Sequence, residues 1–154
     1  MSKQIPAHKR GKFTGRRTSH TFLRLPHYVI TSPQWRALSG NAVKFLVELA
    51  AAYNGGNNGD LAFTRRQAAE RGWRSGGTRD RAAEEAVEAG FAVITRHGHK
   101  GGRCTLYAVT WEPIDDVGNG TLYAAEHKAS RLWERRNPRP QNGPFEAPLQ
   151  GRAA

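Results

Sequence analysis

Apolar side chains in the middle of the chain follow first the spacing of a helix and then that of strands. Between residues 39 and 53 they recur at i, i+3, i+4 and i+7, which predicts an amphipathic helix. Residues 91–95 and 104–111 are rich in β-branched and aromatic side chains, so they favour two strands around a glycine-rich, basic tip. We expect one core, formed by Trp35, Leu38, Phe45, Leu46, Leu49, Ala83, Ala86, Phe91, Ile94, Leu106 and Val109.

Capping residues divide the region before the strands into separate helices. Ser and Thr accept hydrogen bonds from the free N–H groups of a first helical turn, and glycine is typical of the position after the last turn. Thr64 and Gln67 have the spacing of a capping box, and Gly72 and Gly90 end the two helices nearest the strands. The predicted cap residues are Ser32, Ser39, Thr64 and Ser75.

Charge and proline content divide the chain into four parts. Residues 1–21 contain many basic and no acidic residues, which predicts a flexible basic arm, with a solubilising tail as the alternative. Residues 22–116 contain the patterned elements and form the expected domain. Residues 117–136 have the composition of a C-terminal helix with Leu132 and Trp133 as anchors, and the proline-rich tail, 137–154, is expected to be disordered.

The composition indicates a partner with many negative charges. The chain has 154 residues, a net charge of +11 and a pI of about 10.7, and such a charge favours a polyanion. Ribosomal and membrane-surface proteins are basic as well, so charge alone does not name the partner. No apolar run reaches the roughly 20 residues of a membrane span, and the N-terminus does not resemble a secretory signal. The single cysteine fits a reducing compartment, so we expect a cytoplasmic protein with no membrane partner.

The start of the helix capped by Ser75 has the small and basic residues that reading of a DNA major groove requires. Glycine and short side chains let a backbone approach base edges, and arginine pairs with O6 and N7 of guanine. A flexible turn explains the two glycines equally well. Arg79 and Arg81 are the candidates for guanine contacts. The full predicted set is Ser75, Gly76, Gly77, Thr78, Arg79 and Arg81.

Other basic residues surround this helix start and are expected to contact phosphates. They belong to the short helix before it, the tip between the strands and the arm: Arg65, Arg66, Arg71, Arg74, His99, Lys100, Arg103, Arg16 and Arg17. A solvated basic face is the alternative. Glu84, Glu85 and Glu88 would repel DNA, so only the N-terminal half of the helix is expected to enter the groove.

No group of residues indicates catalysis or a metal. His97, His99 and Cys104 lack a fourth ligand and paired cysteine spacing, so Cys104 is interpreted as an ordinary strand residue. No nucleophile, base and acid stand at a recognisable spacing, and no loop has a phosphate-binding pattern. We therefore expect no enzyme activity, no metal and no cofactor.

Residues 75–91 closely resemble the recognition helix and following turn of bacterial winged helix-turn-helix proteins. The matching positions are Ser75, Thr78, Arg81, Ala82, Glu88, Ala89, Gly90 and Phe91. The longer span 22–111 resembles helix-turn-helix proteins of proteobacteria and phages, and the N-terminal winged-helix domains of some replication initiators. Arg79 stands where such helices usually carry a small or apolar residue, which either moves it toward DNA or indicates a helix register shifted by one.

The resemblance implies an α+β fold, a winged helix-turn-helix with a three-helix core and a β-hairpin wing. It also implies sequence-specific binding of double-stranded DNA, by a transcription regulator or a replication-origin factor of a phage or mobile element. Two alternatives stay open. The first is a non-specific nucleic-acid or RNA-binding protein, and the second is a protein-interaction module such as a phage-encoded inhibitor of a host enzyme. The oligomeric state is open and allows a homodimer.

Overall fold

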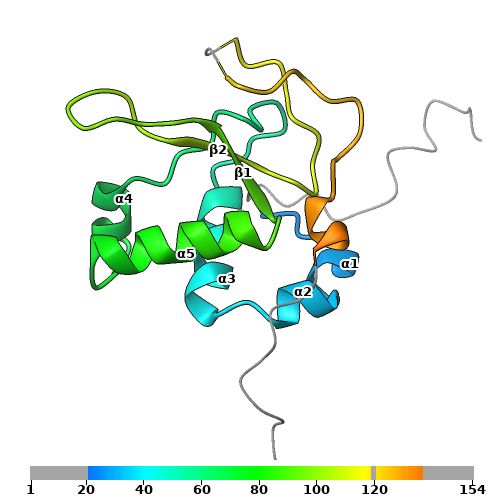
Figure 1. The fold of residues 1–154 in the computed structure, drawn as a ribbon, viewed down its shortest axis with the longest axis horizontal. Coiled ribbons are helices and arrows are strands. Elements are labelled where there is room, and N and C mark those ends of the chain that lie inside the picture. The colour runs from blue at the N-terminus through cyan, green and yellow to red at the C-terminus, as the bar shows by residue number, and fades with distance from the viewer. Residues whose placement is uncertain (1–20, 119–120, 137–154) are drawn as a thin grey trace, which may run out of the picture.

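The computed structural model describes residues 21–118 and 121–136, which form an α+β structure of five α-helices and a two-stranded antiparallel sheet (Figure 1). The basic arm, with Arg16 and Arg17, and the proline-rich tail lie outside the described residues, apart from Thr21. In chain order the elements are α1 (His27–Ile30), α2 (Pro33–Arg36), α3 (Gly40–Ala50), α4 (Arg65–Glu70), α5 (Gly76–Glu88), β1 (Ala92–Arg96), β2 (Leu106–Val109) and a 3₁₀ turn, η2 (Leu132–Arg135).

Side-chain caps fix the starts of α2, α3, α4 and α5, as predicted. Ser32, Ser39 and Ser75 each accept a hydrogen bond from the backbone N–H three residues further on, at 3.1–3.2 Å. Thr64 and Gln67 form both hydrogen bonds of a capping box. Because each cap satisfies a backbone donor that the helix leaves free, it sets the first residue of its helix.

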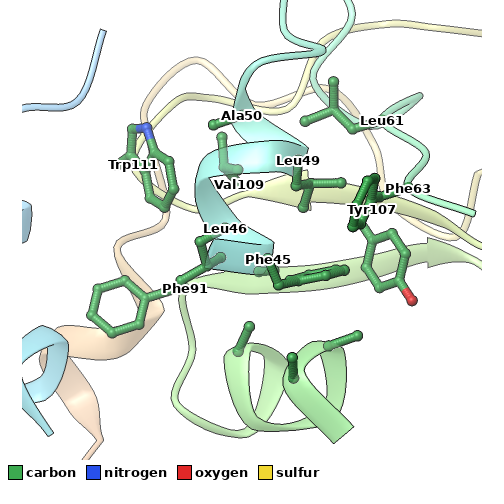
Figure 2. Packing of buried hydrophobic residues seen from close by; sticks show 14 of the residues in the cluster. Phe45, Leu46, Leu49, Ala50, Leu61, Phe63, Phe91, Tyr107, Val109 and Trp111 are labelled. Atoms are coloured by element: carbon green, nitrogen blue, oxygen red, sulfur yellow. The ribbon is translucent and has the colours of Figure 1, made fainter. Parts of the chain in front are cut away.

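The core lies between α3, α5 and the sheet. Phe45, Leu46 and Leu49 of α3 are fully buried, and Figure 2 shows them packed together with residues from the strands and loops. On α5 the buried apolar residues are Ala82, Ala83 and Ala86. Most of the predicted core is confirmed; Trp35, Leu38 and Ile94 are partly buried at its margin, and Leu106 is buried outside the main cluster.

The sheet is shorter than the sequence predicts. β1 and β2 pair antiparallel, with Ala92 opposite Val109, and the register becomes irregular between Ile94 and Arg96. Leu61 forms an isolated bridge with Tyr107 of β2, through backbone hydrogen bonds of 2.8 and 3.2 Å. The interpretation of Cys104 as a strand residue is wrong, because the pairing stops at Leu106 and Cys104 lies exposed in the loop.

The segment before η2 does not form the predicted helix. Its backbone bonds to the rest of the fold instead, through Leu122 N to Thr95 O (2.7 Å) and Arg131 N to Thr110 O (2.9 Å). Backbone groups paired with distant elements are no longer available for the i to i−4 bonds of a helix. Trp133 is nevertheless the predicted anchor, with 1% of its surface exposed.

Gly90 lets this segment pack against the end of α5. Its φ is +84°, in the left-handed region that favours glycine. A Cβ atom at this position would lie 2.8 Å from the backbone N of Trp133, and the Trp133 ring stacks on Phe91 with centroids 5.2 Å apart. No helix in the described part of the chain is both long and apolar enough to cross a membrane.

Leu46→Ala should lower the free energy of unfolding by about 2–5 kcal/mol, because the Leu46 side chain is fully buried between helices. Urea unfolding of the variant and the parent measures this difference. Val47→Ala, at a neighbouring exposed position, is the matched control and should change stability far less. Equal stability of Leu46→Ala and the parent would contradict the core described above.

Candidate nucleic-acid interface

Most of the basic residues that were predicted to contact DNA lie on one edge of the molecule. Figure 1 shows α4, the N-terminal end of α5 and the loop between β1 and β2 on the same side of the fold. We group seven of the exposed basic side chains of these three elements and of the connection between α4 and α5. We call this group the basic edge: Arg65, Arg66, Arg74, Arg81, His99, Lys100 and Arg103.

Carboxylates already neutralise part of the basic edge and its surroundings. Arg66 pairs with Glu70 one turn further along α4, at 3.1 Å, and Arg71 beside the edge pairs with Glu48. Within residues 21–118 and 121–136, Arg74 and Arg81 form no ion pair and are exposed. Among the cations of α5 and of the connection before it, these two arginines are therefore available to bind an anion.

Arg79 lies in the interior, so the prediction that it pairs with guanine is wrong. It is 8% exposed, its Nη2 donates to the carbonyl of Phe63, and its Nη1 donates to Asp80 at 3.0 Å. The guanidinium also lies 5.5 Å from the ring centroid of Phe45 and 5.8 Å from that of Tyr107. The predicted helix register is correct, since Ser75 is the cap. Position 79 is buried because it precedes Ala82 and Ala83 by three and four residues and shares their face.

The two glycines at the start of α5 have different surroundings. A Cβ atom at Gly77 would meet only Ser75 Oγ, at 4.0 Å, so the space beside it is open. A Cβ atom at Gly76 would lie 2.9 Å from Cδ of Arg65. Space for a partner is therefore present at Gly77, whereas at Gly76 the protein fills it with its own side chain. Thr78 is half-buried, and its hydroxyl lies 2.9 Å from that of Ser75.

Asp80 connects the start of α5 to α4 and to the interior. Its carboxylate accepts hydrogen bonds from Nη1 of Arg79 and from Nε of Arg65, the latter at 3.0 Å. Burial raises the pKa of Asp80, but the hydrogen bonds and charges of Arg65 and Arg79 outweigh it, so the pKa lies below its usual value. The same hydrogen bond raises the pKa of Arg65. This contact could not be predicted from the sequence, because it depends on how α4 and α5 pack.

The loop between the strands forms a tight, basic tip. His99 N donates to the carbonyl of Arg103, and Gly102 N donates to that of His99, both at 3.1 Å. A Cβ atom at Gly102 would lie 1.8 Å from Nε2 of His99, so the imidazole lies over this glycine. Lys100 and Arg103 are exposed on the tip. In the described part of the chain, no three His, Cys, Asp or Glu side chains are grouped as metal ligands.

A groove of about 360 Å³ lies between α5, from Arg79 to Glu88, and the hairpin. Its lining includes the carboxylates of Asp80, Glu84 and Glu88 and the apolar side chains of Ala83, Val87 and Ile94. Asp80 is paired with Arg65 and Arg79, but Glu84 and Glu88 would repel a phosphate, so the N-terminal half of α5 is the better contact surface for DNA. A scan against family models and searches of curated proteins and of solved structures found no match, and the site is defined by the side chains described above.

Arg79→Met should destabilise the fold by about 1–3 kcal/mol, because it leaves the buried carbonyl of Phe63 without its donor. Thermal and urea unfolding measure the change. Arg81→Met, on the exposed face of the same helix, is the matched control and should have the stability of the parent. If both variants are as stable as the parent, the burial assigned to Arg79 is wrong.

The lowered pKa of Asp80 makes its contribution to stability depend on pH. A carboxyl whose pKa falls on folding stabilises the protein above its unfolded pKa of about 3.9 and loses that effect as the pH falls through the folded pKa. The difference in unfolding free energy between the parent and Asp80→Asn should therefore be largest near neutral pH and shrink below about pH 4. Urea unfolding across this range tests it, with the exposed Asp116→Asn as control. A difference that does not vary with pH would refute the assignment.

Proposed function

We propose that this protein is a winged helix-turn-helix protein that binds double-stranded DNA sequence-specifically through its basic edge. The order of elements supports this fold: α3, the short pairing of Leu61, α4, α5 and the β1–β2 hairpin follow one another along the chain. In such a fold the second helix of the pair enters the major groove and the hairpin contacts the duplex beside it. Here that helix is α5.

The observation that carries the proposal is the division of α5 into two chemically different halves. Its first turns present an open glycine, Gly77, and the exposed Arg81, which forms no ion pair with any described residue. Its last turns present Glu84 and Glu88. A major groove about 12 Å wide admits a helix end-on, and Arg81 can then pair with a guanine edge while the acidic end stays outside.

The other members of the basic edge are assigned to phosphates. Arg65, Arg66 and Arg74 flank the start of α5, and His99, Lys100 and Arg103 belong to the hairpin tip. Contacts of this kind orient a protein on the duplex without reading its sequence. Arg16 and Arg17 of the basic arm are proposed to add further phosphate contacts. A transcription regulator or a replication-origin factor of a phage or mobile element would use such a surface.

The position of the aromatic side chains favours duplex DNA over RNA or single strands. Proteins that bind unpaired bases expose aromatic rings on which the bases stack. The aromatic residues of the strands and of the core beside them are buried instead: Phe63, Phe91, Tyr107 and Trp111. The exposed Tyr123, which follows the Leu122 that bonds to β1, is a single ring. A stacking platform is therefore absent from this part of the described structure.

A protein partner is the second candidate function, and the α5–hairpin groove is the observation that favours it. The groove combines an apolar lining with the exposed carboxylate of Glu84, which suits a basic side chain of another protein. Selection from random duplex and random RNA libraries by the full chain separates these functions. We expect one enriched duplex motif; an equally diffuse recovery of duplex and RNA, or no recovery, would contradict the proposal.

Arg81→Ala should weaken binding to the selected duplex by about 1–3 kcal/mol and binding to a scrambled duplex much less, because a guanine contact is lost. Fluorescence titration of both duplexes at one salt concentration measures this. Arg66→Ala is the matched control on α4 and should weaken both duplexes alike. Equal losses for Arg81→Ala on the two duplexes would reassign Arg81 to a phosphate, and unchanged binding would exclude α5 as the reading helix.

A further inference from the structure

Gly76 makes room for a specific side chain of the neighbouring helix. The three nearest atoms to a Cβ built at this position are Cδ, Nε and Cγ of Arg65, at 2.9, 3.2 and 3.3 Å. All three belong to one flexible side chain, so an alanine here displaces Arg65 and leaves the backbone in place. The Arg65 side chain can therefore take this path only because residue 76 has no side chain.

Arg65 is held at both ends of this path. It is the first residue of α4, immediately after the capping box of Thr64. At its other end Nε donates to Asp80 of α5 at 3.0 Å, and Nη2 bonds to the same carboxylate oxygen. Asp80 in turn is fixed by the buried Arg79. The Arg65 side chain therefore lies across the first turn of α5 in one defined arrangement.

This arrangement leaves most of the guanidinium accessible. The Arg65 side chain is 72% exposed, and a guanidinium has five N–H donors, of which Asp80 engages only those on Nε and Nη2. The remaining donors lie beside the start of α5, where free backbone N–H groups and the helix dipole also favour an anion. A side chain that is already ordered loses less entropy when it binds.

We propose that Gly76 is a positioning residue for Arg65. Because residue 76 has no side chain, Arg65 can lie across the first turn of α5, already oriented to contact a phosphate of the duplex. The inference rests on the proposed function and names one backbone contact of that interface. It also gives the two glycines separate roles, since Gly77 borders open space and Gly76 borders Arg65.

Four variants test the proposal: Gly76→Ala, Gly40→Ala as the matched control, Arg65→Ala, and the double variant Gly76→Ala with Arg65→Ala. Gly40 is the first residue of α3, as Gly76 is of α5, and an added Cβ there meets nothing within 4 Å. Affinity for the selected and scrambled duplexes is measured between low and moderate salt. Gly76→Ala should weaken both duplexes and lower the slope of log K against log salt by about 0.9, the value of one phosphate contact. Gly40→Ala should keep the full slope, because Gly40 is not part of the basic edge. The double variant should match Arg65→Ala, because the glycine acts only through that arginine.

Two further measurements separate positioning from a structural effect. The melting temperature of Gly76→Ala should equal or exceed that of the parent, because alanine favours helix more than glycine does. The Nε–Hε signal of Arg65 in ¹⁵N spectra should be distinct in the parent and in Gly40→Ala and averaged in Gly76→Ala, and this readout needs no DNA.

Two results would overturn the inference and leave the proposed function intact. One is a salt slope in Gly76→Ala equal to that of the parent, and the other is a further loss of affinity when Gly76→Ala is added to Arg65→Ala. An unchanged Arg65 Nε–Hε signal in Gly76→Ala would overturn it as well. If the parent binds no duplex, the proposed function fails, and the phosphate role of Arg65 fails with it.

Discussion

The close packing of α5 on α3 is the constraint on which the rest of the fold depends. The apolar residues that α5 buries in this contact are small, Ala82, Ala83 and Ala86, while α3 contributes large ones such as Phe45 and Leu46. Small residues on one helix let the other approach, and large residues fill the space between them. Because the alanines fix the buried face of α5, they also decide which side chains of this helix are exposed.

The same contact explains why two arginines on one helix have opposite environments. Arg79 lies on the alanine face and donates hydrogen bonds to the carbonyl of Phe63 and to the carboxylate of Asp80. Arg81 lies on the exposed face. Asp80, between them, extends the buried network outward to Arg65 of α4. The Arg79 side of this network is buried, whereas the Arg65 side chain is 72% exposed, so its ion pair with Asp80 orients Arg65 and adds little to stability.

Local features of the fold could be predicted from the sequence, whereas long-range ones could not. The starts of four helices follow from Ser or Thr and its neighbours within one turn, and the structure confirms them. The burial of Arg79 was readable from its helical spacing to Ala82 and Ala83, but its charge favoured a surface position. Asn58 is fully buried, and its Nδ2 donates to the carbonyls of Val109, Glu112 and Pro113. Such pairings depend on residues more than 50 positions away, for which a single sequence gives no signal.

The most direct test of the proposed interface is a map of backbone amide NMR shifts during titration of the full chain with its selected duplex. The account predicts the largest changes in α4, in the first two turns of α5 and in the loop between β1 and β2. It predicts small changes in α1 and α2, which Figure 1 places away from that edge. Changes centred on α1 and α2, with the basic edge unaffected, would contradict it.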